Sequence, residues 1–196
     1  SVGFTFVQTI NIPIVPTTHN LSVWKNTIDD NPLNDTVHNP FRVYTGAGES
    51  LPYAQDFESF NTCSTNNDCG GTNCFLGNGW TNTGNGAGDD IDFRTNSGAT
   101  PSSGTGPNSD HSQGTSQGKY LYLEASGACE FRQADLYSPC FDLSSTVAPI
   151  ATMWYHMSGT NMGDLHFDVF ANNQWHTDVI PVISGNKGSA WLEAVL

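Results

Sequence analysis

Short runs of alternating polar and apolar positions recur along the chain and predict β-strands. Leu21 and Val23 alternate with Ser22 and Trp24 near the start, and a side-chain period of two is that of a strand. Other segments expected to form strands are 1–15, 51–59, 119–126, 151–157, 164–170, 173–183 and 189–196. We interpret the large aromatic side chains on the later strands as core rather than as a binding platform, because aromatic rings dominate protein cores.

In two of these segments the strand period assigns the side chains to opposite faces. In 119–126 the faces are Tyr120, Tyr122 and Glu124 against Leu121, Leu123 and Ala125. In 164–170 they are Leu165, Phe167 and Val169 against His166, Asp168 and Phe170.

Turn-forming residues separate the strands, and helical periodicity is nearly absent. Gly occurs 20 times and Pro 10 times, and Asn, Ser and Thr crowd the stretches between strands. Several short strands separated by turn signals are typical of a sandwich. The predicted fold class is therefore all-β.

The chain is predicted to hold two units. Residues 1–46 resemble the last strands of an immunoglobulin-type domain of the CARDB kind, through the Asn-rich turn DDNPLNDT. Residues 47–55 are expected to be a linker, since they are mostly small and lack a pattern. Residues 56–196 form the second unit. The chain has no signal peptide at its start and stops within an apolar pattern, so it is expected to be part of a longer protein.

The charge balance is strongly acidic, with 19 Asp and Glu against 6 Lys and Arg and a formal net charge of −13. Nucleic acid and anionic membrane surfaces are poor partners for such a chain, because their phosphates need clustered cations. No apolar run approaches the roughly 20 residues of a membrane span, so membrane insertion is not expected. The acid excess is suited to solubility or to binding of cations.

Five cysteines predict disulfides and an extracellular location. None of their spacings fits a zinc module, and disulfides form in oxidising compartments. The odd count leaves one thiol over or a partner outside the chain. We expect Cys129–Cys140, which would tie two sandwich edges around ADLYSP. We also expect one bridge within a Gly- and Asn-rich loop, either Cys63–Cys74 or Cys69–Cys74.

A series of short motifs over residues 50–196 resembles a MAM domain, the extracellular adhesion module named after meprin, A5/neuropilin and the mu-type receptor phosphatase. The motifs occur in order: Phe57-Glu58, Gly79-Trp80, Asp89-Asp90-Ile91-Asp92-Phe93, Ser109-Asp110-His111, Gly118-Lys119-Tyr120, Tyr137-Ser138-Pro139 and Trp154-Tyr155-His156-Met157. The family often has a cysteine just before the last motif, where this chain has Ala151-Thr152, and its pattern continues past the strand at Trp191.

The resemblance implies a jelly-roll β-sandwich, truncated here at its C-terminal end, that takes protein or glycan partners. The loop style, with GATPSSGTGPNSDH and SPCFDLS, resembles MAM copies in large secreted proteins of Bacteroidetes. Those proteins join Ig-like, MAM and type IX sorting domains at the cell surface.

The carboxylates of the DDIDF segment are candidates for a calcium site. Asp90 and Asp92 share a face if the segment is extended, and Ca²⁺ takes six to eight oxygen ligands. MAM domains often hold one cation near the first strand, which adds Glu58 and Asp110, and Asp56 as a further candidate. The predicted ligand set is Glu58, Asp90, Asp92 and Asp110, with capping of turns as the alternative role of these acids.

No catalytic residue is predicted. Two carboxylates could form a glycosidase pair, but no other feature supports one. Asp110-His111 lacks a GxSxG elbow, and HExxH is absent. His156, His166 and His176 are expected to be surface or hydrogen-bonded residues rather than a metal trio.

The expected function is that of a non-catalytic adhesion or binding module, secreted or at the cell surface, and covalently continuous with other domains. The alternatives are an accessory domain of a secreted protease or glycosidase, and a structural spacer in a surface adhesin or filament. A hydrolase signature in the flanking sequence would favour the first alternative, and tandem repeats would favour the second.

Overall fold

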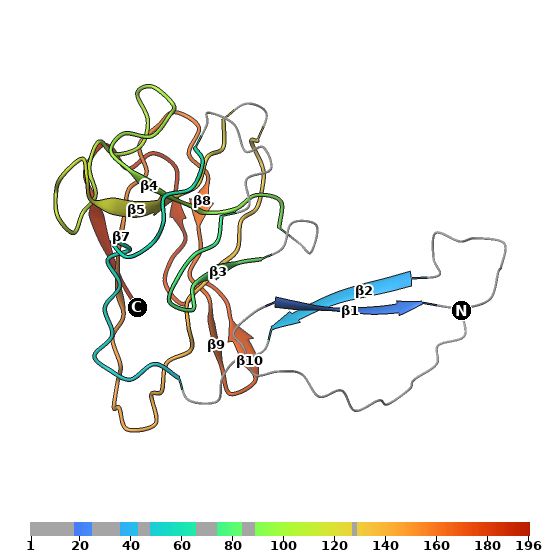
Figure 1. Ribbon diagram of the computed structural model, residues 1–196. Helices are drawn as coiled ribbons and strands as arrows, with labels where there is room; N and C mark the ends of the chain where they lie inside the picture. The colour runs from blue at the N-terminus through green and yellow to red at the C-terminus, as the bar shows by residue number, and fades with distance from the viewer. Residues whose placement is uncertain (1–17, 25–35, 43–47, 66–73, 84–88, 127–128) are drawn as a thin grey trace.

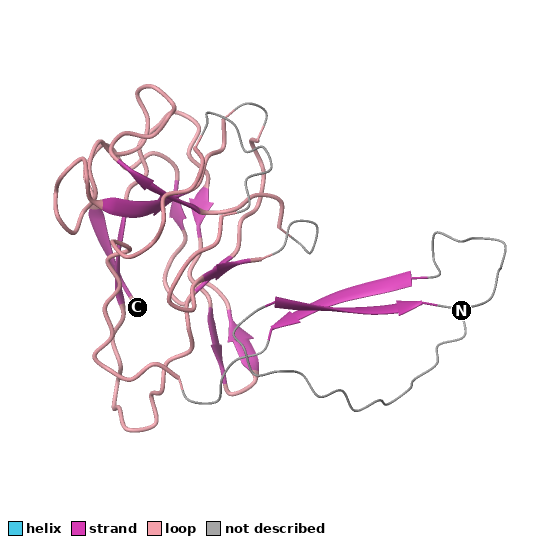
Figure 2. Cartoon of the chain, viewed as in Figure 1, coloured by secondary structure: helices cyan, strands magenta, loops and turns pink. Residues whose placement is uncertain are grey.

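The computed structural model describes residues 48–65, 74–83, 89–126 and 129–196, and the backbone alone of residues 18–24 and 36–42. These residues form strands, turns and loops, and none of them is helical (Figure 2). The prediction of an all-β fold is confirmed. None of the described elements is a helix that could cross a membrane.

The N-terminal segment forms an antiparallel hairpin of β1 (Thr18–Trp24) and β2 (Thr36–Arg42) (Figure 1). Strand β1 confirms the strand predicted from the alternation at Leu21 and Val23. Residues 1–15, also predicted to form a strand, lie outside the described residues, and the assignment of 1–46 to an immunoglobulin-type domain stays a prediction.

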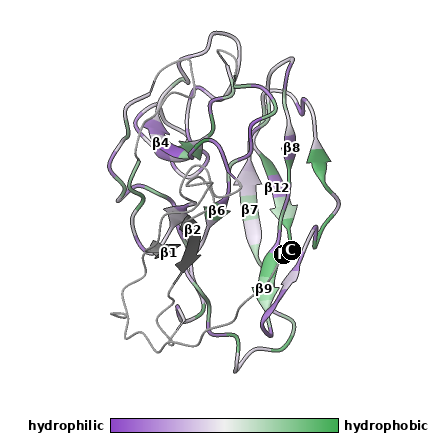
Figure 3. Ribbon diagram, turned by 90° about the vertical axis from the view of Figure 1, so that its right-hand side faces the viewer, coloured by the Kyte–Doolittle hydropathy of each residue, from purple (hydrophilic) through white to green (hydrophobic). Residues whose placement is uncertain are grey.

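The second unit is built from short strands that pair antiparallel. Its strands are β3 (Thr81–Asn82), β4 (Arg94–Ser97), β5 (Lys119–Tyr122), β6 (Leu136–Tyr137), β7 (Thr152–Tyr155), β8 (Asp164–Leu165), β9 (Val169–Ala171), β10 (Gln174–His176), β11 (Ile183–Ser184) and β12 (Leu192–Val195). The pairs are β3–β6, β4–β5, β7–β12, β8–β11 and β9–β10. The paired strands β7 and β12 lie next to each other in Figure 3.

Aromatic side chains from outside the strands fill one part of the core. The ring of Phe57 lies 5.4 Å from those of Phe60 and Trp80, both edge-on. Phe60 and Trp80 are buried, and the indole N–H of Trp80 donates to the hydroxyl of Tyr53 at 2.9 Å. The buried indole is therefore satisfied as well as packed.

Strand β5 buries the face that carries its polar head groups. Tyr120, Tyr122 and Glu124 are buried, whereas Leu123 is 37% exposed. The Tyr120 hydroxyl donates to the Gly98 carbonyl at 2.6 Å and accepts from Asn96 Nδ2 at 2.9 Å. These hydrogen bonds satisfy the buried hydroxyl group of Tyr120.

The strand predicted over 51–59 is absent, and the segment forms bends and turns. Just before it, Glu49 makes an isolated bridge to Phe141. Phe57 has a left-handed backbone with φ of 65°. Its amide donates to Gln55 Oε1 at 2.8 Å, and the Glu58 amide donates to Asp56 Oδ1 at 3.1 Å. Local side-chain acceptors of this kind compete with sheet ladders, which explains why this prediction is wrong.

The hairpin β9–β10 closes through Asn172 and Asn173, which have φ of 53° and 61°. Two central residues with positive φ define a type I′ turn, whose twist matches that of the flanking strands. This turn sets Phe170 directly opposite Trp175.

Candidate binding site

Two of the predicted calcium ligands, Glu58 and Asp110, contact one short segment at the start of β5. Glu58 Oε1 accepts the Lys119 amide at 2.9 Å. Asp110 is 2% exposed and accepts the amides of Gln113 at 2.6 Å and Thr115 at 3.1 Å. Its carboxylate packs so closely on Gly118 that a Cβ at that position would overlap it. Asp110 therefore closes the loop that leads into β5.

The other acids gather around the entry to β4. Asp89 is 1% exposed and accepts the Asp135 amide at 3.1 Å through Oδ2, whereas its Oδ1 is buried without a hydrogen bond. Burial, followed by the charges of Asp92, Asp135 and Asp90, raises the pKa of Asp89 to about 6. Burial also raises the pKa of Asp92, against the opposing effect of Arg94.

The four residues predicted to bind calcium thus fall into two groups. Glu58 and Asp110 cap backbone amides next to β5, while Asp90 pairs with Arg132 at 3.4 Å beside Asp92 in the second group. No set of three or more His, Cys, Asp or Glu in the described part of the chain is arranged to hold a metal ion. The four predicted ligands therefore do not form one shared calcium site, and calcium binding stays a prediction.

Replacement of Asp89 by asparagine is expected to stabilise the fold at neutral pH by about 1–3 kcal/mol, because one pKa unit corresponds to ~1.4 kcal/mol. The folded-state pKa is about 6 and the ordinary value is 3.8, so between these values the folded wild type binds a proton that the unfolded chain does not. Wild-type stability therefore rises as pH falls through this window, and the advantage of the variant should vanish near pH 4.

Urea unfolding of wild type and Asp89→Asn between pH 4 and 8 measures this difference. Asp90→Asn is the matched control, since its ion pair with Arg132 is about half exposed and should contribute less than ~1 kcal/mol. Comparing each variant with wild type cancels the contribution of His156, whose pKa burial lowers. A difference in stability between wild type and Asp89→Asn that does not change with pH would contradict the raised pKa of Asp89.

An aromatic cluster ties the loop before β5 to the strands at the C-terminal end. Trp191 lies just before β12 and donates its indole N–H to the Ser109 carbonyl at 3.0 Å. Its ring lies edge-on to Tyr120, His111 and His156, at 5.9, 6.3 and 5.4 Å. Trp191 therefore links the loop before β5 and β5 itself to the end of β7.

Asp110 and three of the histidines, which the sequence offered as candidates for catalysis or metal binding, each contact a neighbouring group. Asp110 accepts backbone amides, as described above, and His111 stacks on Trp154 with ring centroids 3.7 Å apart. His156 packs on Trp191, and His166 Nδ1 lies 2.7 Å from Asp178 Oδ1. Each side chain thus has a structural partner of its own.

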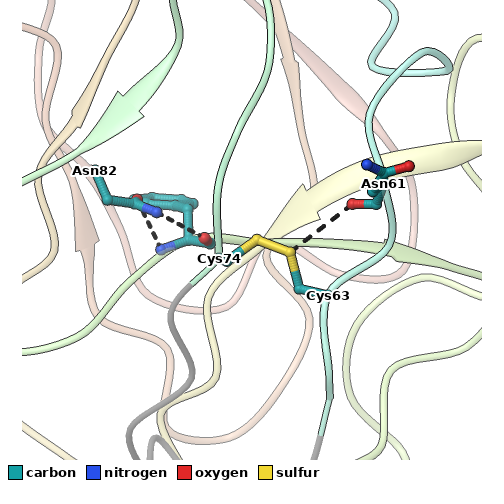
Figure 4. The surroundings of a disulfide bond; sticks show 5 residues. Asn61, Cys63, Cys74 and Asn82 are labelled. Carbon is teal, nitrogen blue, oxygen red and sulfur yellow. Dashed lines mark hydrogen bonds between the residues drawn. A yellow bond between two sulfur atoms is a disulfide. The ribbon is translucent and has the colours of Figure 1, made fainter. Parts of the chain in front are cut away.

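A disulfide joins Cys63 and Cys74, with Cα atoms 5.6 Å apart (Figure 4). The Cys63 amide donates to the Thr95 carbonyl of β4 at 2.9 Å, so the bridge ties this loop to the sheet. The second predicted bridge, Cys129–Cys140, is wrong: Cys140 is a free, exposed cysteine. Cys129 is disulfide-bonded, and its partner is none of Cys63, Cys74 and Cys140. Proximity in sequence favours this bridge, but Cys129 is buried and already bonded, whereas the thiol of Cys140 is exposed.

Removal of the Cys63–Cys74 bridge is expected to lower the free energy of unfolding by about 2–4 kcal/mol, because the bridge closes a loop that restricts the unfolded chain. The double variant Cys63→Ser, Cys74→Ser measured by urea unfolding tests this, with Cys140→Ser as the neutral control. Alkylation without reduction should label Cys140 and leave Cys63 and Cys74 unlabelled, and recovery of a labelled Cys63 peptide would contradict the pairing.

A half-exposed aromatic pair lies on the hairpin β9–β10. Phe170 is 52% exposed and Trp175 is 47% exposed, and their ring centroids are 5.2 Å apart. Tyr137 of β6 packs edge-on against Trp175 at 6.0 Å. Figure 3 shows the hydrophobic colour of β9. We call these three rings the aromatic platform.

The expectation that the strand aromatics are core is wrong for Phe170, Trp175 and Trp154, of which Trp154 is 42% exposed. Sequence reasoning could have found the pair, because a two-residue Asn-Asn turn places Phe170 opposite Trp175. Which face of the hairpin is covered depends on the neighbouring strands and could not be read from the pattern.

The family model of the MAM domain, meprin/A5/mu, matches residues 56–196. The chain belongs to the MAM domain family. It is 35% identical over 103 residues to neuropilin-1a of Danio rerio, covering 52% of this chain and 11% of that protein. It is 37% identical over 97 residues to neuropilin-1 of Xenopus laevis, covering 49% and 10%.

A third relative is MAM domain-containing glycosylphosphatidylinositol anchor protein 1 of Homo sapiens, 36% identical over 92 residues, with coverage of 46% of this chain and 9% of that protein. The chain thus spans about a tenth of the length of these curated relatives. No solved structure matches it significantly. MAM domains are modules of larger proteins.

Proposed function

We propose that this chain is a non-catalytic extracellular binding module that attaches a larger secreted or cell-surface protein to a protein ligand. The observation that carries the proposal is the aromatic platform, which leaves two rings about half exposed at adjacent positions. Exposed aromatic side chains are enriched at the energetic centres of protein interfaces. Membership of the MAM family supports the same reading.

Disulfides support the extracellular location. The bridge between Cys63 and Cys74, together with the bonded Cys129, points to folding in an oxidising compartment. One relative is by its name an anchor protein of the glycosylphosphatidylinositol class, which favours a cell-surface setting for this module. The bacterial setting suggested by the loop style stays a prediction.

An adhesion assay tests the proposal. Fluorescent beads that carry the full chain are allowed to settle on cultured cells and on plain lipid bilayers, and retention under flow is measured. We expect retention on cells, a loss of at least about fivefold for Phe170→Ser with Trp175→Ser, and no loss for Phe75→Ser, a control at a side chain that is 89% exposed elsewhere.

Equal retention of all variants would exclude the platform as the binding site. The same preparation is screened for turnover of denatured protein and polysaccharide, with His111→Ala as a comparison. Turnover by the wild type that this variant loses would replace the binding-module proposal by a catalytic one.

We keep structural calcium as a separate proposal, supported by the acidic composition and by the buried, unpaired oxygens of Asp89 and Asp92. An ion bound only by the folded state raises the melting temperature. Thermal unfolding in EDTA and then in excess Ca²⁺ is the measurement. Identical melting temperatures would remove the proposal, and Asp92→Asn should abolish any shift that is seen.

A further inference from the structure

A carboxylate, that of Asp168, lies immediately before the strand that carries Phe170. Asp168 precedes Phe170 by two positions, and the period of an extended backbone assigns residues at this spacing to the same face. Asp168 Oδ1 accepts the amide of Asp178 at 2.8 Å, which fixes the carboxylate at the open end of the hairpin. An ionised carboxylate has about four acceptor sites, so Asp168 can accept further hydrogen bonds from a ligand.

The rings themselves are held in place by neighbours. Phe170 and Trp175 are direct partners in the β9–β10 register. Tyr137 contacts Trp175 from the neighbouring pair of strands, with an angle of 67° between the ring planes. A pair of rings fixed on a tight hairpin loses little side-chain freedom when a ligand covers it.

The negative charge of the chain favours a cationic ligand for this surface. The formal net charge is −13, which attracts cations and repels polyanions. Three of the described cations have other roles: Arg94 is buried, Lys119 donates to the carbonyls of Glu58 and Phe60, and Arg132 pairs with Asp90. The platform, by contrast, combines exposed rings with an acid.

We propose that Asp168, Phe170 and Trp175 form a recognition site for a basic segment of a protein partner, in which an arginine side chain stacks on the rings and pairs with the carboxylate. A guanidinium is planar, stacks on aromatic faces and pairs with carboxylates in a bidentate manner. The complementary charge places the partner among basic proteins. This inference rests on the proposed binding function and adds the chemistry of the partner.

Nuclear magnetic resonance of the full ¹⁵N-labelled chain provides the test. The probes are three synthetic decapeptides of alternating Gly with Arg, Lys or Glu, and the neutral oligosaccharide cellohexaose. The indole N–H signal of Trp175, assigned by its loss in Trp175→Phe, reports occupancy of the site. We expect the arginine peptide to shift this signal, the lysine peptide to bind more weakly, and the glutamate peptide to leave it unchanged.

Matched variants separate this site from the general negative field of the chain. Asp168→Asn keeps an oxygen that can accept the Asp178 amide but loses the charge, and Trp175→Ser loses the ring. Each is expected to weaken arginine-peptide binding by about five- to tenfold. Phe75→Ser and Glu193→Gln, exposed positions elsewhere on the chain, should leave binding unchanged.

Three outcomes would overturn the inference. The first is arginine-peptide binding that is equal in wild type and Trp175→Ser. The second is absence of binding at every tested salt concentration. The third is a Trp175 shift with cellohexaose but not with the arginine peptide, which would make the platform a saccharide site. If beads are still retained on cells while one of these results is obtained, the proposed binding function stands. Only the inference that the partner is basic is then rejected.

Discussion

Replacement of Trp191 by alanine is expected to lower the free energy of unfolding by about 2–4 kcal/mol, somewhat less than the ~3–5 kcal/mol for a fully buried aromatic residue, because the side chain is only partly buried. The indole contacts rings from the loop before β5, from β5 itself and from the strand end after β7. Its N–H is also the donor for the Ser109 carbonyl. The substitution removes all these contacts at once and leaves the carbonyl without its partner.

Urea unfolding followed by circular dichroism measures this effect. Trp175→Ala is the matched control, because it removes an equally large but half-exposed ring and should change stability by roughly 1 kcal/mol. In Trp191→Ala, amide exchange should also rise across the loop of residues 98–118, since the loop loses its anchor. Equal losses for the two tryptophan variants would contradict the special role of Trp191.

Replacement of Gly118 by alanine is expected to destabilise the fold by about 1–3 kcal/mol, because the added methyl group overfills a packed site. A Cβ at this position would overlap the carboxylate of Asp110. That carboxylate cannot easily move aside, since the amides of Gln113 and Thr115 hold both of its oxygens. Space rather than backbone angle therefore requires glycine here.

A matched glycine and a double-mutant cycle make this prediction specific. A Cβ built at Gly163 meets no atom within 4 Å, so Gly163→Ala should be neutral or slightly stabilising. In an Asp110→Ala background the added loss from Gly118→Ala should shrink by at least 1 kcal/mol, because contacting residues couple. If the losses of stability from Gly118→Ala and Asp110→Ala simply add, the methyl group at position 118 does not clash with the Asp110 carboxylate.

The proposed binding function rests on the aromatic platform, which lies at the surface. The platform is the surface that mutagenesis should find first, and the Asp110 loop and the Trp191 cluster are the supports of the fold. Variants at Gly118 and Trp191 should therefore lose stability before they lose binding, while Trp175→Ser should do the reverse. Measuring both properties for all three separates the structural role from the binding role.

The sequence by itself determined the class of fold and the position of most strands. Period-two alternation at Leu21, along 119–126 and in the C-terminal third identified segments that form strands, because side-chain alternation is a local property of extended backbone. The order of short motifs identified the MAM family, and the family match over residues 56–196 confirms it. Local chemistry also indicated that one bridge would form within the loop around Cys63 and Cys74.

Only the tertiary structure decided which faces are covered and which distant residues meet. The pattern of β5 could not show that the face with Tyr120 and Tyr122 is buried, because that depends on partners such as Asn96 across the sheet. The free thiol of Cys140 and the separation of the four predicted calcium ligands into two groups also depend on loop paths. The burial of a side chain and its pairing depend on neighbours that are far apart in the sequence, so a local sequence pattern cannot predict them.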